Sequence, residues 1–378
     1  MTDFEEFWWN NITGPHSVVT KTSELLSTKF AVLLLVPGDL PWRHTMRSAI
    51  DAEFKRRSSM MDILIRPIDV KDEYLQDIAP GQFILRNYAS ESVKNEYRVG
   101  SGMSMQEYIK RNSVLKNTIL WLKGFNNAEQ VKDWVNFCSD YATGAVVDGL
   151  FILEVQDNMR LPAHSSIPKI NFSEYVDSYN LLLFCSFLLD EQKELTAQWK
   201  SYIAAMVSNL CETDAEVAER MILETNFMNE EPLDVLSRIA KEPDFVRRGE
   251  GAQHAFALLR NRNNLTLKKR LWSAQVQVLF PVIELERVEI VRQWHAEIAA
   301  ALAKHPEQRG YGNGSNEAID DLCDIELGQL NHMIINHMLE IPAPEIRSRI
   351  ALLRTCRNLL AHGECCSAAQ TGKLLNAS

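Results

Sequence analysis

Short apolar runs alternate with longer mixed segments in the first half of the chain. Five of these runs are continuous rather than alternating, and we expect each to form a strand: 29–36, 62–68, 118–124, 149–155 and 179–186. Strands that are covered on both faces of a parallel sheet show this continuous apolar pattern. The segments 41–57, 105–115 and 127–141 lie between the runs and have helical spacing. This order predicts an α/β fold with a doubly wound parallel sheet.

Helical periodicity replaces the strand pattern from residue 190 onward. Apolar positions recur every three to four residues in the segments 195–210, 214–228, 232–240, 265–302 and 320–338. The loop 305–315 contains Gly310, Gly312 and Gly314 and separates two long helices. We therefore expect an N-terminal helical segment (1–28), an α/β domain (29–189), a helical linker domain (190–264) and a C-terminal all-α helical bundle (265–378).

The composition is that of a folded protein with full apolar cores. Hydrophobic residues make up 46% of the 378 positions and charged residues 24%, which excludes an intrinsically disordered chain. The 40 Lys and Arg residues are outnumbered by 50 Asp and Glu residues, so a protein that coats nucleic acid through its overall charge is also excluded. Any nucleic-acid site must therefore be local.

The cysteines and the apolar runs bear on the compartment. Five of the seven cysteines lie inside apolar runs, where buried free thiols are expected, and this usage is typical of a reducing compartment. The first residues lack the basic stretch of a signal peptide, and no apolar run approaches the roughly 18 residues that a membrane-spanning helix needs. We therefore expect a cytoplasmic protein with no membrane partner.

The turn after the first predicted strand lies where a nucleotide-binding P-loop would be. A working P-loop needs glycines that expose backbone N–H groups, a Lys for the outer phosphates and a hydroxyl for magnesium. Here only Gly38 remains, Pro37 and Pro41 lack an N–H group, and Asp39 would repel phosphate. The third strand ends at Gly124 without a magnesium-binding acid. The sequence predicts a degenerate P-loop that does not hydrolyse ATP or GTP, and no cofactor is expected.

Several features of this half resemble the inactivated members of the STAND class of signalling NTPases, which occur in bacterial conflict systems. They are the strand that ends at Gly38 with Trp42 and Arg43 after it, the strand 119–124 followed by the segment 127–137, and the next strand at Gly149. The resemblance covers 29–189 and implies a sensing or scaffolding core rather than a motor. Arg43 and Arg47 could hold an anion other than a nucleotide, or they could be exposed arginines on a helix face.

A set of polar residues occurs on the predicted helix that ends near residue 362. Arg354, Asn358 and His362 are spaced i, i+4 and i+8 and so share one face, while Arg357 flanks that face. Gly363 is a good helix terminator, which places His362 in the last turn. One helix end is thus expected to present a cation, an amide and an imidazole together.

This string resembles the Arg-Asn-x-x-x-His motif of the HEPN superfamily, α-helical domains of which many are metal-independent endoribonucleases. The match covers Arg357, Asn358 and His362, and the segments 271–287 and 321–330 look like earlier helices of the bundle. The resemblance spans 265–375 and implies a composite site at which two such helices meet across a homodimer. His362 would take the proton from the RNA 2′-hydroxyl, Arg357 would stabilise charge on the phosphate, and Asn358 would orient the phosphate or the ring.

Further basic residues are candidates for RNA binding. Arg354 lies on the motif helix, and Lys268, Lys269 and Arg270 form a basic cluster next to Trp272 that could follow an RNA backbone. A solvated helix start is the alternative explanation for the cluster.

No metal site is expected from the remaining histidines and cysteines. His332 and His337 lie on different helical faces, and the adjacent Cys365 and Cys366 lack the spacing of a C-x-x-C pair.

Two functions follow as hypotheses. In the first, the chain is a toxin-like or antiviral endoribonuclease effector that acts on RNA, and its N-terminal domain senses a trigger or restrains the nuclease. In the second, it is a non-catalytic subunit that binds protein partners in a defence complex. The second reading expects Arg357 to form an ion pair with Asp324 or Glu326, and His362 merely to cap its own helix.

Overall fold

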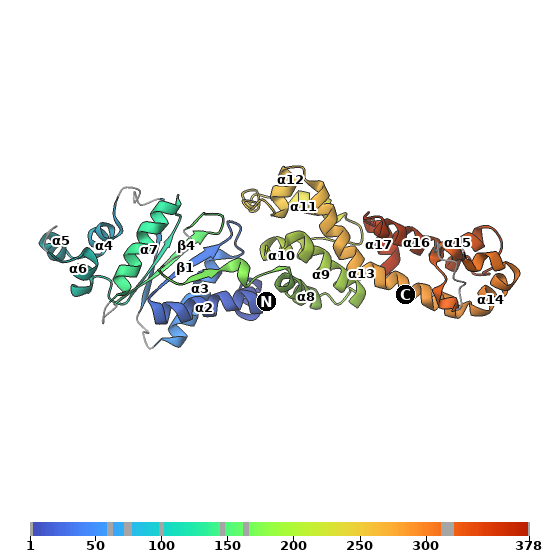
Figure 1. Cartoon of the computed structure of the whole chain (residues 1–378), viewed down its shortest axis with the longest axis horizontal. Coiled ribbons are helices and arrows are strands. Elements are labelled where there is room, and N and C mark those ends of the chain that lie inside the picture. The colour runs from blue at the N-terminus through green and yellow to red at the C-terminus, as the bar shows by residue number, and fades with distance from the viewer. Residues whose placement is uncertain are drawn as a thin grey trace. The chain divides into compact units, whose positions relative to one another are not determined.

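The computed structural model describes residues 3–58, 63–71, 78–97, 102–143, 148–161, 166–310 and 321–376. The chain folds into two compact units (Figure 1). The α/β unit comprises Met1–Phe184, Thr213–Glu216 and Arg248–Gly251, and the helical unit comprises Cys185–Glu212, Val217–Arg247 and Ala252–Ser378. The mixed architecture expected from the sequence, a parallel sheet first and helices afterwards, is therefore confirmed.

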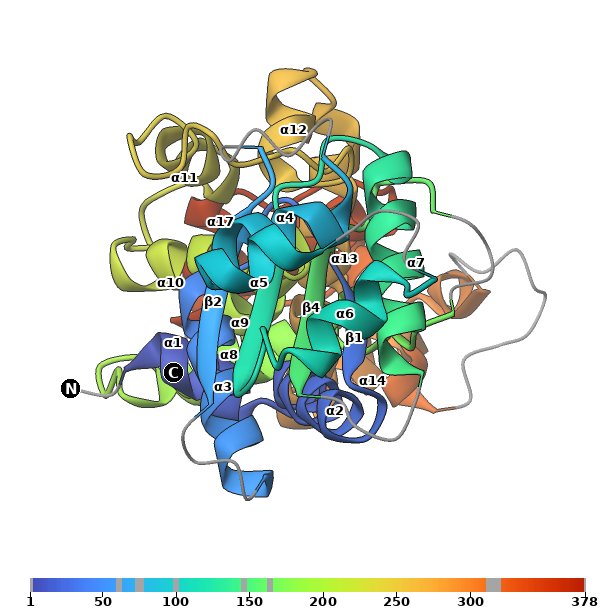
Figure 2. The same ribbon diagram turned by 90° about the vertical axis from the view of Figure 1, so that its left-hand side faces the viewer.

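The α/β unit is built on a five-stranded sheet in which every pairing is parallel. The strand order is β2-β3-β4-β1-β5, and Figure 2 shows the first four side by side and running in one direction. The strands are β1 (Ala31–Val36), β2 (Leu64–Asp69), β3 (Thr118–Lys123), β4 (Gly149–Gln156) and β5 (Lys169–Asn171). Every residue of β1 is buried, as expected for a strand flanked by neighbours on both edges and by helices on both faces.

Helices cover both faces of this sheet, and Figure 1 shows α2 and α7 on opposite sides of it. On one face α1 (Phe4–Asn11), α2 (Thr13–Lys29) and α3 (Arg43–Arg57) pack together. On the other face α4 (Pro80–Tyr88), α6 (Met105–Arg111) and α7 (Ala128–Ala142) pack together, with α5 (Glu91–Glu96) beside α4. Large aromatic side chains are buried between these helices and the sheet. Trp8 contacts Phe184 edge to face, and Trp134 contacts Phe83 in the same way.

The fifth predicted strand is wrong. The run 179–186 lies within the helix α8 (Ser178–Asp190), and the fifth strand of the sheet is the short β5. A continuous apolar run does not by itself distinguish a buried strand from a buried helix. This run contains leucines but no β-branched residue, which favours a helix. In addition, Asp177 accepts hydrogen bonds from the N–H groups of Tyr179 and Asn180 and so caps the first turn.

The helical unit is organised along α13, a helix of 30 residues. Its elements are the C-terminal part of α8, α9 (Ala197–Cys211), α10 (Ala215–Leu223) from its third residue onward, α11 (Pro232–Ile239), α12 (Ala255–Arg260), α13 (Asn264–Gln293), α14 (His295–Lys304), α15 (Leu327–Ile335), α16 (Pro344–Ala361) and α17 (Ala368–Leu375), with 3-10 turns at Pro306–Gly310 and Leu322–Asp324. α13 packs along α9 and α16. Its apolar positions therefore face two neighbours, which explains the length of the periodic pattern in the sequence.

Two predicted helices differ in detail from the observed ones. The segment 265–302 forms two helices because Trp294, with φ −109° and ψ 28°, leaves the helical conformation between α13 and α14. The segment 320–338 contains a 3-10 turn and the shorter α15. Of the glycines in the predicted loop 305–315, Gly312 and Gly314 lie outside the described residues.

The thiols fit the expectation from the sequence. Of the five cysteines placed in apolar runs, four are buried and free and Cys323 is half-buried. Within the described ranges, no helix is both long enough and apolar enough to cross a membrane.

Candidate functional site

The candidate site lies on α16, whose ends are well defined by the sequence. Pro344 occupies the first turn, where a missing N–H group costs nothing. At the other end the N–H of Gly363 donates to Leu360 O, and the N–H of Glu364 donates to Leu359 O. This is a Schellman pair, and Gly363 has the positive φ of 79° that it requires. His362 is the C-cap residue, so the predicted place of the imidazole at the helix end is confirmed.

One face of α16 is buried and the opposite face is polar. Ile350, Leu353, Cys356 and Leu360 form the buried stripe. Arg349 is bonded within the unit, because its guanidinium donates to Glu286 Oε2 at 2.6 Å and to Leu374 O at 2.9 Å. By contrast, four side chains have neither an ion pair nor a side-chain hydrogen bond with any residue in the described part of the chain: Arg354, Arg357, Asn358 and His362.

Arg357 and Asn358 line a cavity of about 420 Å³. The other walls are α13, which contributes Phe280, and the segment that contains Asp324 and Glu326. Among the described residues neither carboxylate forms an ion pair with Arg357. The ion pair expected if this helix is purely structural is thus absent from this part of the chain.

Arg287, rather than Arg357, binds the segment that contains Asp324. Its guanidinium donates to Cys323 O at 2.6 Å, to Ile325 O at 2.8 Å and to Glu284 Oε2 at 2.7 Å. These bonds hold the segment before α15 against α13. Sequence reasoning missed this wall of the cavity, although Phe280, Glu284 and Arg287 are spaced i, i+4 and i+7 on one helix face.

The exposed His362 lies at the end of α16 that contacts the start of α13. Trp272 donates from Nε1 to Leu360 O at 2.7 Å, and the Cys365 thiol donates to Lys268 O at 3.4 Å. Gln275 exchanges two hydrogen bonds with the backbone of Cys366, at 2.9 and 2.8 Å. Lys268 therefore lies at the same end of the bundle as His362, although the two residues are far apart in the sequence.

The predicted basic cluster divides into two parts. Lys268 and Lys269 are exposed. Arg270 instead donates to the Glu212 carboxylate, to Gln253 O at 2.9 Å and to Leu210 O at 3.4 Å, so it holds α13 against the end of α9. Burial raises the pKa of Glu212 although Arg270 lowers it in part. Of this cluster, the two lysines therefore remain exposed while Arg270 is bonded within the unit.

In the α/β unit two arginines of α3 share one buried carboxylate. Glu154 on β4 is 3% exposed and receives hydrogen bonds from Arg43, from Arg47 at 2.9 Å and from Trp121 Nε1 at 2.7 Å. Burial works to raise the pKa of Glu154, but the hydrogen bonds and charges of Arg47 and Arg43 outweigh it and leave the pKa below its ordinary value. Both guanidinium groups are thus bound to one carboxylate, and their side chains stay 30% and 19% exposed.

The segment Arg248–Gly251 of the same unit contacts the turn after β1. The Asp39 carboxylate accepts hydrogen bonds from the N–H groups of Gly249 at 2.7 Å and Glu250 at 2.8 Å. A Cβ atom placed on Gly38 would lie 2.2 Å from Glu250 Oε2, so a larger residue there would require the Glu250 side chain to shift. Contacts within the unit therefore occupy the turn after β1, because Arg43 also donates to Pro37 O at 3.0 Å and to Gly38 O at 2.9 Å.

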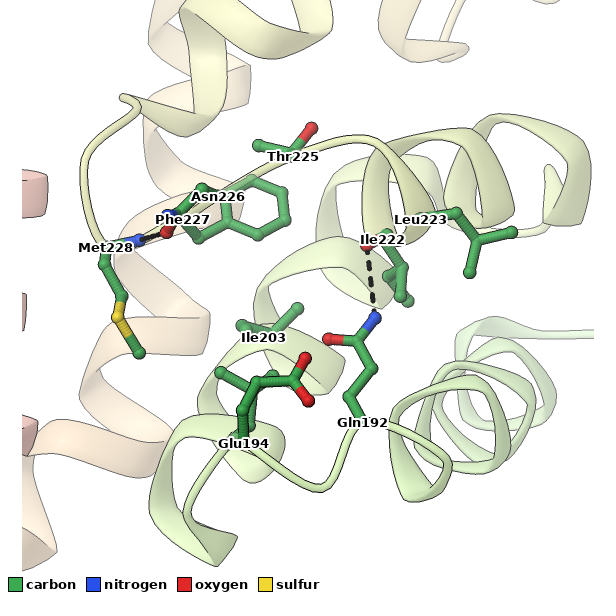
Figure 3. Close-up of a pocket in the computed structure, with 10 residues that line it drawn as sticks. Gln192, Glu194, Ile203, Ile222, Leu223, Thr225, Asn226, Phe227 and Met228 are labelled. Atoms are coloured by element: carbon green, nitrogen blue, oxygen red, sulfur yellow. Dashed lines mark hydrogen bonds between the residues drawn. The ribbon is translucent and has the colours of Figure 1, made fainter.

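A second cavity of the helical unit, of about 350 Å³, lies beside α9 and α10 (Figure 3). Apolar side chains such as Ile203, Ile222 and Phe227 form much of its wall, and Gln192 donates to Ile222 O at 3.5 Å. The exposed Glu194 is the titratable residue on this wall. The cavity has no pairing of a base with a nucleophile or a cation, so it is a weaker candidate than the surface of α16.

Within the described ranges, no group of three or more His, Cys, Asp or Glu residues is placed to hold a metal ion. In comparison with known proteins, no family model matches the chain, and a search of the curated proteins finds no significant match.

Proposed function

We propose that the chain is a metal-independent endoribonuclease effector whose site lies on α16. One observation carries the proposal. α16 presents Arg357, Asn358 and His362 without partners among the described residues, while Arg349 on the same helix is fully bonded. Unpaired cationic and amide side chains on an ordered helix are available to an anionic polymer such as RNA.

The proposed chemistry is transfer of the RNA phosphate to its own 2′-hydroxyl. His362 removes the 2′-hydroxyl proton, the 2′-oxygen forms a bond to phosphorus, and the bond to the 5′-oxygen breaks. Histidine suits this step because it is the side chain that exchanges a proton near neutral pH. Arg357 and Asn358 are assigned to the phosphate oxygens, Arg354 on the face of His362 to the adjoining backbone, and Lys268 and Lys269 to the flanking strand.

A homodimer through the helical bundle is part of this proposal. One chain supplies a single imidazole at its α16 end, whereas the reaction needs a base for the 2′-hydroxyl and an acid for the leaving 5′-oxygen. A two-fold axis that brings two α16 ends together supplies a second imidazole and a second set of arginines. The α/β unit is assigned a sensing or restraining role without nucleotide hydrolysis, which the absence of a P-loop Lys and hydroxyl after Gly38 supports.

The test is a set of single substitutions read by activity and by melting temperature. We expect His362→Ala and Arg357→Ala each to lower RNA cleavage by about 100-fold or more. The melting temperature is expected to stay unchanged, because neither side chain has a partner among the described residues. His295→Ala and Arg292→Ala alter exposed residues of the same types in the same unit and are expected to retain full activity.

Two outcomes of that test would contradict the proposal: activity retained in both site variants, or activity lost only together with the melting transition.

The second function, a non-catalytic subunit that binds protein partners in a defence complex, is favoured by one observation. Asp324 and Glu326 line the cavity next to Arg357, and carboxylates repel a phosphate. Retained activity in both site variants would therefore support this second function.

A further inference from the structure

The cavity beside Arg357 has features that the cleavage chemistry leaves unused. It measures about 420 Å³ and lies among α13, the start of α15 and α16. Cavities of about 300–1,000 Å³ are the usual size of small-molecule sites. Asn358 belongs both to this wall and to the α16 face that ends at His362, one helical turn away. A group bound in the cavity would therefore lie next to the proposed site of cleavage.

Acceptor groups are present on one wall. Glu326 is the N-cap residue of α15, but its side chain accepts no hydrogen bond from that helix. Asp324, two residues earlier, is exposed on the same wall. Neither carboxylate forms an ion pair or a side-chain hydrogen bond with a residue in the ranges that the structure describes. Both are thus available to accept hydrogen bonds from a ligand.

Donor groups are present on the neighbouring walls. The half-buried Arg357 of α16 lines the same cavity. Gly328 lies in the first turn of α15, where backbone N–H groups have no partner within the helix. A Cβ atom added to Gly328 would meet no atom within 4 Å, so a ligand can approach this backbone closely.

An aromatic side chain completes the lining. Phe280 on α13 is half-buried and lines the cavity. Aromatic faces of this kind stack on unpaired bases in proteins that recognise RNA in single-stranded form.

The combination of groups selects the ligand. Two carboxylates make the cavity unfavourable for a phosphate, and a fully apolar ligand would leave the carboxylates and Arg357 unsolvated and unpaired. A guanine base presents two adjacent donors, N1–H and the N2 amino group, to a carboxylate, and the acceptors O6 and N7 to the free backbone N–H groups at the start of α15, which leaves Arg357 to the adjoining phosphate. We propose that this cavity binds a guanine base of single-stranded RNA, which rests on the proposed function because it assigns the base preference of that same site.

The test compares the binding of 5′-GMP and 5′-IMP to the full chain by calorimetry. Inosine differs from guanosine by the loss of the N2 amino group, so the pair isolates the hydrogen bond to the carboxylates. We expect GMP to bind about ten-fold more tightly than IMP, and also more tightly than AMP, CMP and UMP. Equal affinities for GMP and IMP would overturn the proposal, and this comparison requires no substituted protein.

A double substitution locates the preference. Asp324→Asn with Glu326→Gln is expected to remove the discrimination between GMP and IMP, whereas Glu345→Gln, which alters an exposed acid at the start of α16, is expected to keep it. Retained discrimination in the double variant would contradict the assignment. RNA cleavage by a protein that does not distinguish GMP from IMP would overturn this inference and leave the proposed function intact. A GMP preference without any RNA cleavage would overturn the proposed function and keep the base assignment.

Discussion

Substitution of Glu154 by Gln tests the internal charge arrangement of the α/β unit. The carboxylate is buried and is the shared ion-pair partner of Arg43 and Arg47, whose side chains are 30% and 19% exposed. Glu154→Gln keeps the shape but leaves two guanidinium groups without a counter-charge. Removal of one partner from a buried ion pair costs about 3–5 kcal/mol. Because Arg43 stays partly solvated and also donates to Pro37 O and Gly38 O, we expect the lower end of that range, about 3 kcal/mol.

Native-state hydrogen exchange measures this cost within one unit of the chain. Peptides from β1 and β4 are expected to exchange about 100-fold faster in Glu154→Gln than in the natural protein. Glu24→Gln removes an exposed pair with Lys21 on α2 and should leave the same peptides unchanged. Adding Arg47→Met to Glu154→Gln should recover part of the loss, because one unpaired charge is removed. Unchanged exchange in Glu154→Gln, or a further loss in the double variant, would refute the reasoning.

Three further predictions concern pH, nucleotides and assembly. Because the pKa of Glu154 is lowered in the folded state, its stabilisation is complete above the ordinary carboxyl pKa of about 4.3 and is lost as the pH falls through its folded value. As the pH falls, the hydrogen-exchange rate of β4 should therefore rise less steeply in Glu154→Gln than in the natural protein. The same dependence of this rate on pH in both proteins would contradict the prediction. The chain is expected to release no phosphate from ATP or GTP. If phosphate were released, and if Asp39→Ala or Arg43→Ala abolished that release, the chain would instead be a divergent NTPase. Mass photometry should show a homodimer, and a monomer that retains RNA cleavage would exclude the shared site.

Much of the fold could be predicted from the sequence because buried positions are occupied by apolar residues, whose spacing differs between strands and helices. The runs that became β1, β3 and β4 are continuous and apolar, since each strand is covered on both faces. The run at 179–186 was misassigned because full burial removes the difference between the periods of strand and helix. The three residues of β5 carry too short a pattern to detect.

The candidate site could be predicted only in part. The spacing of Asn358 and His362 on one helix and the terminator Gly363 are local properties, and these are confirmed. Contacts between distant segments are not readable from one sequence. The proximity of Lys268 to the end of α16 depends on how two helices cross, and the engagement of Arg270 by Glu212 depends on a third helix. The neutralisation of Arg43 by Glu154 likewise joins residues more than a hundred positions apart.

The chemistry of the RNA fragment ends tests the central claim most directly. Single-stranded RNA should be incubated with the purified chain in the presence of EDTA, and the fragment ends resolved. Cleavage by the 2′-hydroxyl leaves a 2′,3′-cyclic phosphate and a 5′-hydroxyl, and needs no metal ion. We expect these ends with the natural protein and with His295→Ala, and a loss of about 100-fold or more with His362→Ala. Absence of cleavage by the natural protein, or cleavage that EDTA abolishes, would contradict the account.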